Sequence, residues 1–496
     1  MSLPTKVLVA NRGEIAVRVI RGCHELDIKT VAVFSEADRN ALHVRIAGEA
    51  RCIGTAPSSE SYLQGDRIIA VALELGVDAI HPGYGFLSEN AGFARKVQAA
   101  GLIWVGPPPD AIDAMGSKTE SRARMRAAGV PVVPGTVEPL RNEAEAVRVA
   151  AGIGYPVMLK ASAGGGGKGM REVSGPEGLL SALAAARSEA RSSFGDDAVY
   201  IEKRVVDPRH VEVQILADAH GTCVHLFERD CSIQRRNQKV VEETPCPVLP
   251  QATREAMTAV AVQAAQAVGY QGAGTCEFLY DPAHDSFYFL EMNTRLQVEH
   301  PITEAVTGID LVQAQLRIAG GEPLWFAQAD LVQRGHAIEC RVYAEDAADN
   351  WAPSPGRITG YREPGGPWVR VDSGVYPGSE VPIYYDPMVA KLIVWGHNRE
   401  DCIRRTRRAL REYRVRGIRT PIPFFRALMR DPDFLSGVYH TGFLDAERMA
   451  RLTDHAGNDE VATLAAAIAA LERDHETRRF SHADGPALDR WKWSLR

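Results

Sequence analysis

Two glutamates in neighbouring β-prone runs could bind a metal ion together. The runs Glu277–Tyr280 and Phe287–Glu291 flank a turn-like segment, so a hairpin centred near residue 284 places Glu277 opposite Glu291. Two facing carboxylates repel unless a cation lies between them, and Asn293 adds a third oxygen on that face. Oxygen ligands of this kind suit Mg²⁺ that also contacts phosphates; the alternative is two exposed glutamates with no ligand.

The residues that follow could bind an anion and supply a base. If the segment 295–300 stays extended, Arg295, Gln297 and Glu299 project on the same side as the metal-type ligands. A guanidinium binds anions, and a carboxylate can accept a proton. Apolar residues at 292, 296 and 298 alternate with the polar ones, which a merely solvated face does not require. This run therefore predicts a functional edge.

A glycine-rich loop farther upstream is a candidate phosphate site. Segment 162–169 contains four consecutive glycines and follows a strand that ends at Lys160. It does not match the P-loop pattern, because Lys168 precedes a glycine instead of Ser or Thr. Its backbone N–H groups could still close on phosphates beside the Lys160 ammonium. A flexible surface linker is the alternative.

Two more segments carry closely spaced charges. Residues 228–243 contain four cations and four anions, which makes them a candidate functional segment; a plain salt-bridged surface is the alternative. The β-prone run 337–343 points Glu339, Arg341 and Tyr343 to one side.

The expected elements indicate how these residues are positioned. Strands and helices alternate over residues 1–115, which predicts a doubly wound parallel sheet. In such a sheet the segments 11–14 and 81–90 lie beyond the carboxyl ends of strands, where ligands bind. Residues 130–204 are expected to form a separate small module around the glycine loop, with a strand at 155–160 and a helix at 178–191.

The rest of the chain is expected to be mostly strands and hairpins. This part spans 205–446, with helices at 251–268 and 401–412. A tail, 447–496, follows; it contains an amphipathic helical pattern at 459–473 and two tryptophans near its end. Because tryptophan favours interfaces, the tail is a candidate segment for docking a partner. The alternatives are that it packs against its own domain or is the remnant of a truncation.

Composition limits the classes of protein to consider. The 496 residues are 45% hydrophobic and 24% charged, with a net charge of −6, which fits a globular protein and not a basic nucleic-acid binder. No run of 18 apolar residues occurs, and the N-terminal apolar stretch is too short for a signal peptide. The eight cysteines form no C-x-x-C pair, so neither structural zinc nor a disulfide framework is expected. These features predict a cytoplasmic protein that binds neither nucleic acid nor membrane.

In this order, the segments resemble the biotin carboxylase family, ATP-grasp enzymes that carboxylate biotin in acetyl-CoA, acyl-CoA and pyruvate carboxylases. The resemblance covers about residues 5–446. The stretches that carry it are Val9–Ala16, His81–Asn90, Met115–Lys118, Lys160 with the glycine loop, Glu228–Glu243 and Glu291–Glu304. It implies an α/β ATP-grasp fold with an N-terminal doubly wound parallel sheet, a small α/β lid and a mainly antiparallel α+β C-terminal domain.

The resemblance also implies roles for individual residues. The residues implied to bind ATP are Lys118, Lys160, Gly166, Gly167, Glu202, Lys203, Val205, His210, Asn237, Glu277 and Glu291. Glu277, Glu291 and Asn293 are implied to bind Mg²⁺ or Mn²⁺, as two ions. The residues implied to contact bicarbonate or biotin are Tyr84, Lys239, Arg295, Gln297, Val298 and Arg341. Glu299 is implied to deprotonate bicarbonate, and the implied catalytic set is Lys239, Arg295, Glu299 and Arg341.

The same resemblance implies partners. No Met-Lys-Met tripeptide occurs, so the biotin is expected on a carrier protein that, like the carboxyltransferase, lies on another chain or in later domains of a longer one. A homodimer is also expected. Many family members have His where this chain has Asn237, which leaves the contact of that residue with the nucleotide open. The rival hypotheses are another ATP-grasp carboxylate–amine ligase and a catalytically silent ATP-binding subunit.

Overall fold

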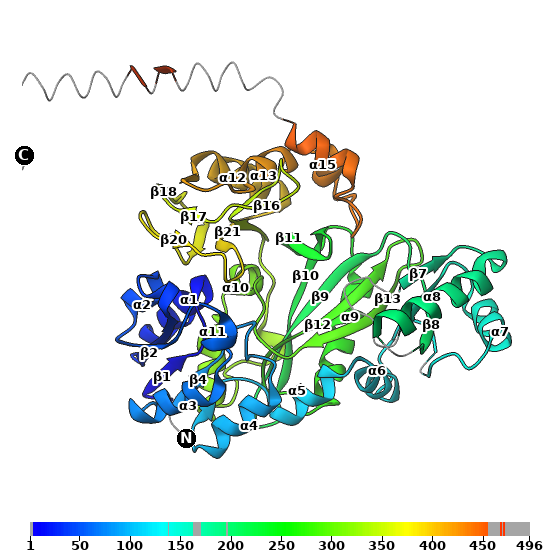
Figure 1. The fold of residues 1–496 in the computed structure, drawn as a ribbon, viewed down its shortest axis with the longest axis horizontal. Helices are drawn as coiled ribbons and strands as arrows, with labels where there is room; N and C mark the ends of the chain where they lie inside the picture. The colour runs from blue at the N-terminus through cyan, green and yellow to red at the C-terminus, as the bar shows by residue number, and fades with distance from the viewer. Residues whose placement is uncertain are drawn as a thin grey trace, which may run out of the picture.

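We analysed a computed structural model, which describes residues 3–136, 138–161, 170–194 and 197–454, together with 467–468 and 470–471. Figure 1 shows the N-terminal part beside a large central sheet, with a smaller unit on the other side of that sheet. The later part of the chain covers the end of the sheet opposite the N-terminus. In the described residues, no helix combines the length and apolar character needed to cross a bilayer.

The N-terminal part is the doubly wound parallel sheet that the sequence predicts. Its strand order is β3-β2-β1-β4-β5, and all four pairings are parallel. The strands are β1 Lys6–Val9, β2 Lys29–Ser35, β3 Glu49–Gly54, β4 Ala79–His81 and β5 Ile103–Trp104. The helices are α1 Gly13–His24, α2 Leu42–Ile46, α3 Gly65–Glu74 and α4 Ala91–Ala99. The strand order reverses between β1 and β4, so the start of α1 and the loop after β4 meet at the ligand-binding edge.

The small unit is a three-stranded antiparallel sheet covered by two helices (Figure 1). Helices α5 Pro109–Gly116 and α6 Lys118–Ala127 lead to it from the N-terminal sheet. Its elements are α7 Glu143–Ile153, β6 Val157–Ala161, β7 Met170–Val173, α8 Leu179–Phe194 and β8 Val199–Lys203. Leu159, Leu183 and Ile201 lie in its own hydrophobic core. The predicted strand at 155–160 begins two residues late, after Pro156, which has no N–H to donate to a ladder.

The central sheet has eight antiparallel strands in the order β13-β12-β9-β10-β11-β14-β21-β19. These strands are β9 Arg209–Ala217, β10 Cys223–Arg235, β11 Gln238–Thr244, β12 Gly272–Asp281, β13 Ser286–Asn293, β14 His336–Tyr343, β19 Val369–Ser373 and β21 Met388–Gly396. The short strands β15 Glu345–Asp346, β16 Ala352–Pro353, β17 Gly356–Arg357, β18 Gly360–Arg362, β20 Glu380–Val381 and β22 Arg414–Arg416 pair in three small sheets.

The helices of this part depart from the sequence prediction. Helices α9 Gln251–Gln266 and α12 Arg399–Glu412 confirm the two expected ones, and α12 begins early because the Asn398 side chain caps its N-terminus. The helices not predicted from the sequence are α10 His300–Thr307, α11 Leu311–Ala319, α13 Ile422–Leu428, α14 Pro432–Ser436 and α15 Ala446–Thr453. The prediction that 295–300 is extended is wrong. The chain turns at residues 298–299 and enters α10, whose first turn contains Pro301, a residue favoured there.

The predicted tail begins within a packed helix. Leu452 on α15 is buried in the core that α12 and α13 share, so the first residues of the segment 447–496 belong to the folded unit. Most of the predicted helix at 459–473 lies outside the described residues, as do the two C-terminal tryptophans.

Candidate active site

The hairpin β12–β13 places the two glutamates opposite each other, as predicted. Its strands pair Asp281 with Ser286, and a bulge between Glu277 and Phe278 shifts the register by one residue. Because of that shift Glu277 lies opposite Glu291, and Thr275 opposite Asn293. Glu277 is buried, so the alternative of two exposed glutamates fails for it, whereas Glu291 is exposed.

Lys239 joins this carboxylate to two others. Its Nζ lies 2.6 Å from Glu212 Oε2, 2.9 Å from Glu277 Oε1 and 2.6 Å from Glu299 Oε1. Burial disfavours the ammonium, but the three carboxylates outweigh that effect and hold the pKa of Lys239 well above its usual range. The ammonium therefore stays charged.

Glu299 lies between two cations at the turn before α10. Its Oε1 contacts Lys239, and its Oε2 accepts a hydrogen bond of 2.9 Å from Arg341, whose Nε donates to Glu242 at 2.6 Å. Burial alone raises the pKa of Glu299, but Lys239, Arg341 and Arg229 hold it well below the usual range. Glu299 is thus ionised, the state that a proton acceptor requires.

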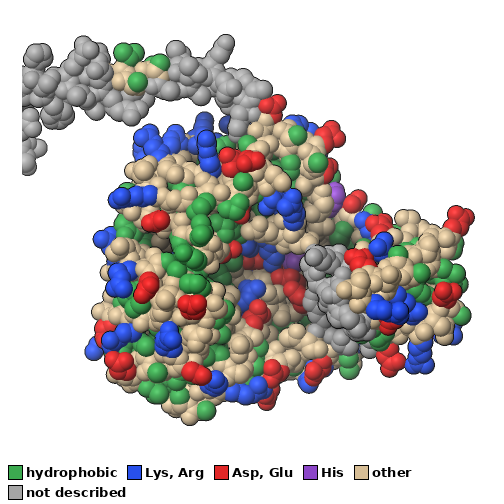
Figure 2. All heavy atoms as spheres, in the orientation of Figure 1, with side chains coloured by type: hydrophobic (Ala, Val, Ile, Leu, Met, Phe, Trp, Pro, Cys, Tyr) green, Lys and Arg blue, Asp and Glu red, His purple; other side chains and the backbone are tan. Residues whose placement is uncertain are grey.

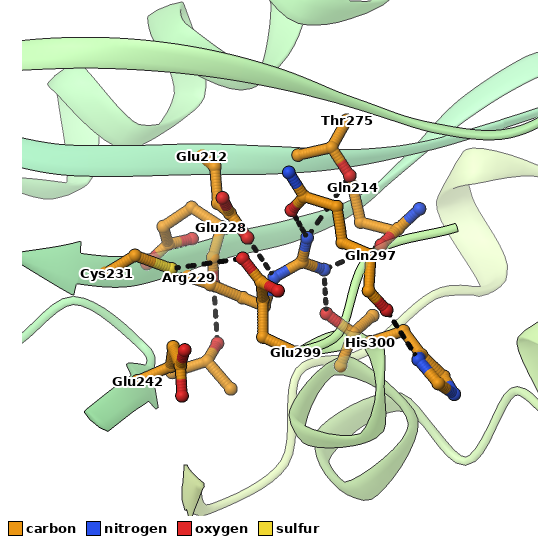
Figure 3. A network of polar contacts seen from close by, with 12 residues as sticks. Glu212, Gln214, Glu228, Arg229, Cys231, Glu242, Thr275, Gln297, Glu299 and His300 are labelled. Carbon is orange, nitrogen blue, oxygen red and sulfur yellow. Dashed lines mark hydrogen bonds and ion pairs between the residues drawn. The ribbon is translucent and has the colours of Figure 1, made fainter. Parts of the chain in front are cut away.

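Arg229 is the central hydrogen-bond donor on the buried side of the site, as Figure 3 shows. It is fully buried on β10 and donates to five acceptors, which are Glu212, Gln214, Thr275, Gln297 and Thr303. The Gln297 amide in turn donates to Glu277 at 2.8 Å. The alternative of a salt-bridged surface is therefore wrong for most of the segment 228–243; only Arg236 and Asn237 in its turn are exposed.

The residues implied to bind metal can supply the necessary oxygen atoms. Glu277 and Asn293 are buried on adjacent strands, and His210 Nε2 lies 3.1 Å from Glu277 Oε2. Lys239 and His210 outweigh the effect of burial and hold the pKa of Glu277 well below its usual range, so it is an anion. A carboxylate beside an amide oxygen, with Glu291 across the strand pair, is a donor set that fits Mg²⁺.

Arg295 lies apart from this cluster. Its guanidinium donates to Asn293 Oδ1 at 2.6 Å and to Glu89 Oε2 at 2.9 Å. The prediction that Arg295, Gln297 and Glu299 share one side of an extended run is wrong, because the chain turns between them. Gln297 and Glu299 contact the Lys239 cluster. Arg295 instead lies beside Asn293, a candidate metal ligand, and so still belongs to the edge that the sequence predicts to be functional.

Some of the residues implied to bind nucleotide lie in the small unit, on β6 and on or just after β8. Glu202 on β8 is buried and pairs with Lys160 at 2.6 Å and with Arg122. Lys203 donates to the carbonyls of residues 154 and 155, and Val205 is half-buried just after β8. Gly166, Gly167 and the Lys118 side chain lie outside the part of the chain that the structure describes.

Asn237 occupies a turn that suits its residue type. Arg236 and Asn237 connect β10 to β11 and have φ values of 48° and 67°, the conformation of a two-residue type I′ hairpin turn. Asparagine tolerates this left-handed region better than most residues. The backbone thus gives a reason for Asn here that is independent of the nucleotide.

We expect Asn237→Val to destabilise the protein by about 1–2 kcal/mol, because a β-branched residue is strained at positive φ. Asn237→Gly is the matched control and should be close to neutral. Urea unfolding without nucleotide measures both variants. Equal losses in the two would mean that the Asn side chain matters more than the backbone.

Several buried charged residues of the site were not assigned individual roles from the sequence. These are Glu212, Arg229 and Glu242, together with Lys391 on β21, which is fully buried. Burial raises the pKa of Glu242 to about 7, although Arg341 opposes the shift. A signal for Glu212 was present, because polar residues at 210, 212 and 214 alternate with apolar ones along β9.

Comparison with known proteins identifies the family. Residues 4–112 match the family described as biotin carboxylase, N-terminal domain, residues 117–326 match carbamoyl-phosphate synthase L chain, ATP binding domain, and residues 339–446 match biotin carboxylase C-terminal domain.

Individual relatives match over nearly the whole chain. A pyruvate carboxylase subunit of Methanothermobacter thermautotrophicus is 54% identical over 444 residues, which cover 90% of each chain. Biotin carboxylase 1 of Bacillus subtilis is 53% identical over 440 residues, covering 89% of this chain and 98% of the relative. The biotin carboxylase domain dimer of Hydrogenobacter thermophilus 2-oxoglutarate carboxylase, solved with MgADP, ADP and bicarbonate, has a TM-score of 0.83 at 47% identity, covering 92% of this chain and 100% of that one. The chain therefore belongs to the biotin carboxylase family and has its ATP-grasp fold.

Proposed function

We propose that the chain carboxylates biotin with ATP and bicarbonate, and that Lys239, Glu299 and Arg341 activate the bicarbonate. One observation carries this assignment: the Glu299 carboxylate is held by Lys239 on one oxygen and by Arg341 on the other. Two cations around one ionised carboxylate form a site for a second anion that carries an acidic proton.

Bicarbonate binding turns Glu299 into a stronger base. Lys239 and Arg341 stabilise ionised Glu299 and make it a weak proton acceptor. When Lys239 and Arg341 turn their hydrogen bonds to bicarbonate, that stabilisation falls and the proton affinity of Glu299 rises. The carboxylate then removes the bicarbonate proton as a bicarbonate oxygen attacks the γ-phosphorus of ATP.

This attack forms a P–O bond to bicarbonate and breaks the P–O bond to ADP, which gives carboxyphosphate. Lys160 and Lys118 are the cations that we assign to the phosphates, under the lid around Gly166 and Gly167. Glu277, Glu291 and Asn293 would hold Mg²⁺, which would neutralise part of the phosphoryl charge. We assign Glu202, Lys203, Val205, His210 and Asn237 to the nucleotide side of the site.

The second step transfers the carboxyl group. Cleavage of the C–O bond in carboxyphosphate releases CO₂ and phosphate, the phosphate accepts the ureido proton of biotin, and the ureido nitrogen bonds to CO₂. We assign Arg295 to the negative charge that develops on the ureido oxygen, and Tyr84, Gln297 and Val298 to the binding of biotin or bicarbonate.

We propose that the biotin arrives on a carrier protein and that a carboxyltransferase uses the product, as parts of other chains or of a longer chain. The Methanothermobacter relative is named as one subunit of a pyruvate carboxylase, which supports a multi-subunit assembly. The dimer of the Hydrogenobacter domain supports a homodimer. We further propose residues 130–204 as a lid module and the residues after α15 as a docking segment.

We expect ATP cleavage by the purified chain to require bicarbonate and to increase when free biotin is added, because the proposed nucleophile is bicarbonate. Phosphate release in CO₂-depleted buffer, with and without added bicarbonate, measures this dependence. An ATP cleavage rate that ignores bicarbonate would show that water is the nucleophile and would overturn the proposed function.

A further inference from the structure

A buried lysine outside the assigned residues reaches the turn that carries Glu299. Lys391 lies on β21, its side chain has no exposed surface, and its Nζ donates a 2.7 Å hydrogen bond to the carbonyl oxygen of Val298. That carbonyl belongs to the peptide unit that joins Val298 to Glu299. The orientation of this peptide plane helps to set the direction in which the Glu299 side chain leaves the backbone.

The same ammonium is anchored to the N-terminal sheet domain. Lys391 Nζ lies 3.3 Å from Glu14 Oε2 at the start of α1, and Glu14 also accepts a hydrogen bond from the Tyr84 hydroxyl. The Nζ lies 5.9 Å from the centre of the Tyr84 ring. Residues from the loop after β4, from α1 and from the turn before α10 thus meet at one cation. In the space-filling view of Figure 2, basic and acidic side chains gather in the hollow between the N-terminal part and the rest of the molecule.

The packing around this cation leaves little room for adjustment. A Cβ atom added to Gly374, which follows β19, would lie 2.6 Å from the backbone nitrogen of Glu14. The segment after β19 therefore rests directly on the first turn of α1. Asp372 Oδ2 lies 4.0 Å from Lys391 Nζ and is already paired with Arg370. Glu339, buried on β14, is a third carboxylate whose charge Lys391 stabilises. Lys391 is held by these neighbours in one position.

We propose that Lys391 is a positioning residue for the bicarbonate site, which fixes the Val298–Glu299 peptide relative to Tyr84. Lys391 lies opposite Arg341 in the β14–β21 pairing, but its ammonium donates to the Val298 carbonyl, so it acts on Glu299 through the backbone. This inference rests on the proposed roles of Glu299 and Val298. It predicts a defect in bicarbonate use that spares ATP binding.

Lys391→Met tests the proposal, because it keeps most of the side-chain length and removes the donor and the charge. We expect kcat/KM for bicarbonate in ATP cleavage to fall on the order of 10²-fold, the effect of a misplaced reacting group, while the Kd for ADP stays unchanged. Lys6→Met is the matched control. Lys6 donates to the carbonyl of Leu75 at 2.6 Å, far from the site, and its loss should leave bicarbonate kinetics unchanged.

A double variant separates positioning from charge balance. Lys391→Met leaves the buried Glu14 without its cation. The double variant Glu14→Gln/Lys391→Met removes both charges, so no uncompensated Glu14 carboxylate remains to destabilise the fold. If Lys391 positions Val298, the double variant remains defective in bicarbonate use. Recovery of bicarbonate kinetics in the double variant would show that Lys391 only neutralises Glu14, and would overturn the proposal.

The proposed function has a separate test. If the unaltered chain cleaves ATP without bicarbonate, the proposed function fails. If the unaltered chain needs bicarbonate and Lys391→Met retains the kcat/KM for bicarbonate, only the positioning role fails. A loss of kcat in proportion to the folded fraction, with no change in the KM for bicarbonate, would also contradict positioning.

Discussion

Glu299→Gln is expected to lower the rate of bicarbonate-dependent ATP cleavage by about 10²–10⁴-fold, the usual contribution of a positioned general base. The amide has nearly the same shape, and its one oxygen can still accept from Lys239 or from Arg341, but it cannot take the bicarbonate proton. The affinity for ATP should change little, because Glu299 contacts groups assigned to bicarbonate. Steady-state kinetics with varied bicarbonate, together with nucleotide titrations, measure both quantities.

Glu243→Gln is the matched control for this prediction. Glu243 is equally buried on β11 but pairs with Arg399 and His336, on the sheet face opposite Glu242. It should lose stability and keep its rate per folded molecule. A Glu299→Gln variant with normal turnover would assign the base to another residue, and one that also loses ATP binding would mean that Glu299 supports the nucleotide site.

Arg229→Met is expected to cost about 3–5 kcal/mol of the free energy of unfolding, because removing one partner of a buried ion pair leaves the other uncompensated. Arg229 has no exposed surface, and its loss also leaves Gln214, Gln297 and two threonines without their donor. Urea unfolding followed by far-ultraviolet circular dichroism measures the change.

An exposed arginine provides the comparison for this second prediction. Arg404 on α12 pairs with Glu400 four residues away at the surface, and Arg404→Met should change stability by less than about 0.5 kcal/mol. Equal losses of stability in the two variants would contradict the view that Arg229 stabilises the buried side of the site through its hydrogen bonds.

The hairpin with Glu277 and Glu291 could be predicted because the side-chain period of a strand is fixed. The predicted pairing is correct because of a bulge that the sequence does not reveal. Without the bulge, the register that begins with Asp281 opposite Ser286 would place Leu290 opposite Glu277. The doubly wound N-terminal sheet was also predictable, since its strands and helices alternate clearly.

The position of Glu299 relative to Lys239 and Arg341 could not be predicted from the local periodicity of the sequence. Lys239 and Arg341 reach Glu299 from β11 and β14, which are separated from it by 60 and 42 residues. Such contacts depend on sheet order, which short-range periodicity does not determine. The turn at residues 298–299 was missed because alternating apolar residues suggested a strand, whereas the chain turns there and enters helix α10 at His300, with Pro301 in its first turn.

The fate of the bicarbonate oxygen tests the central claim most directly. With ¹⁸O-labelled bicarbonate, ATP and free biotin, attack on the γ-phosphorus followed by cleavage of the C–O bond leaves a bicarbonate oxygen in the released phosphate. We predict a single ¹⁸O atom in each phosphate at early times, before bicarbonate exchanges its oxygens with water. Phosphate that contains no label from bicarbonate, and takes its oxygen from water instead, would contradict activation of bicarbonate by Glu299, Lys239 and Arg341.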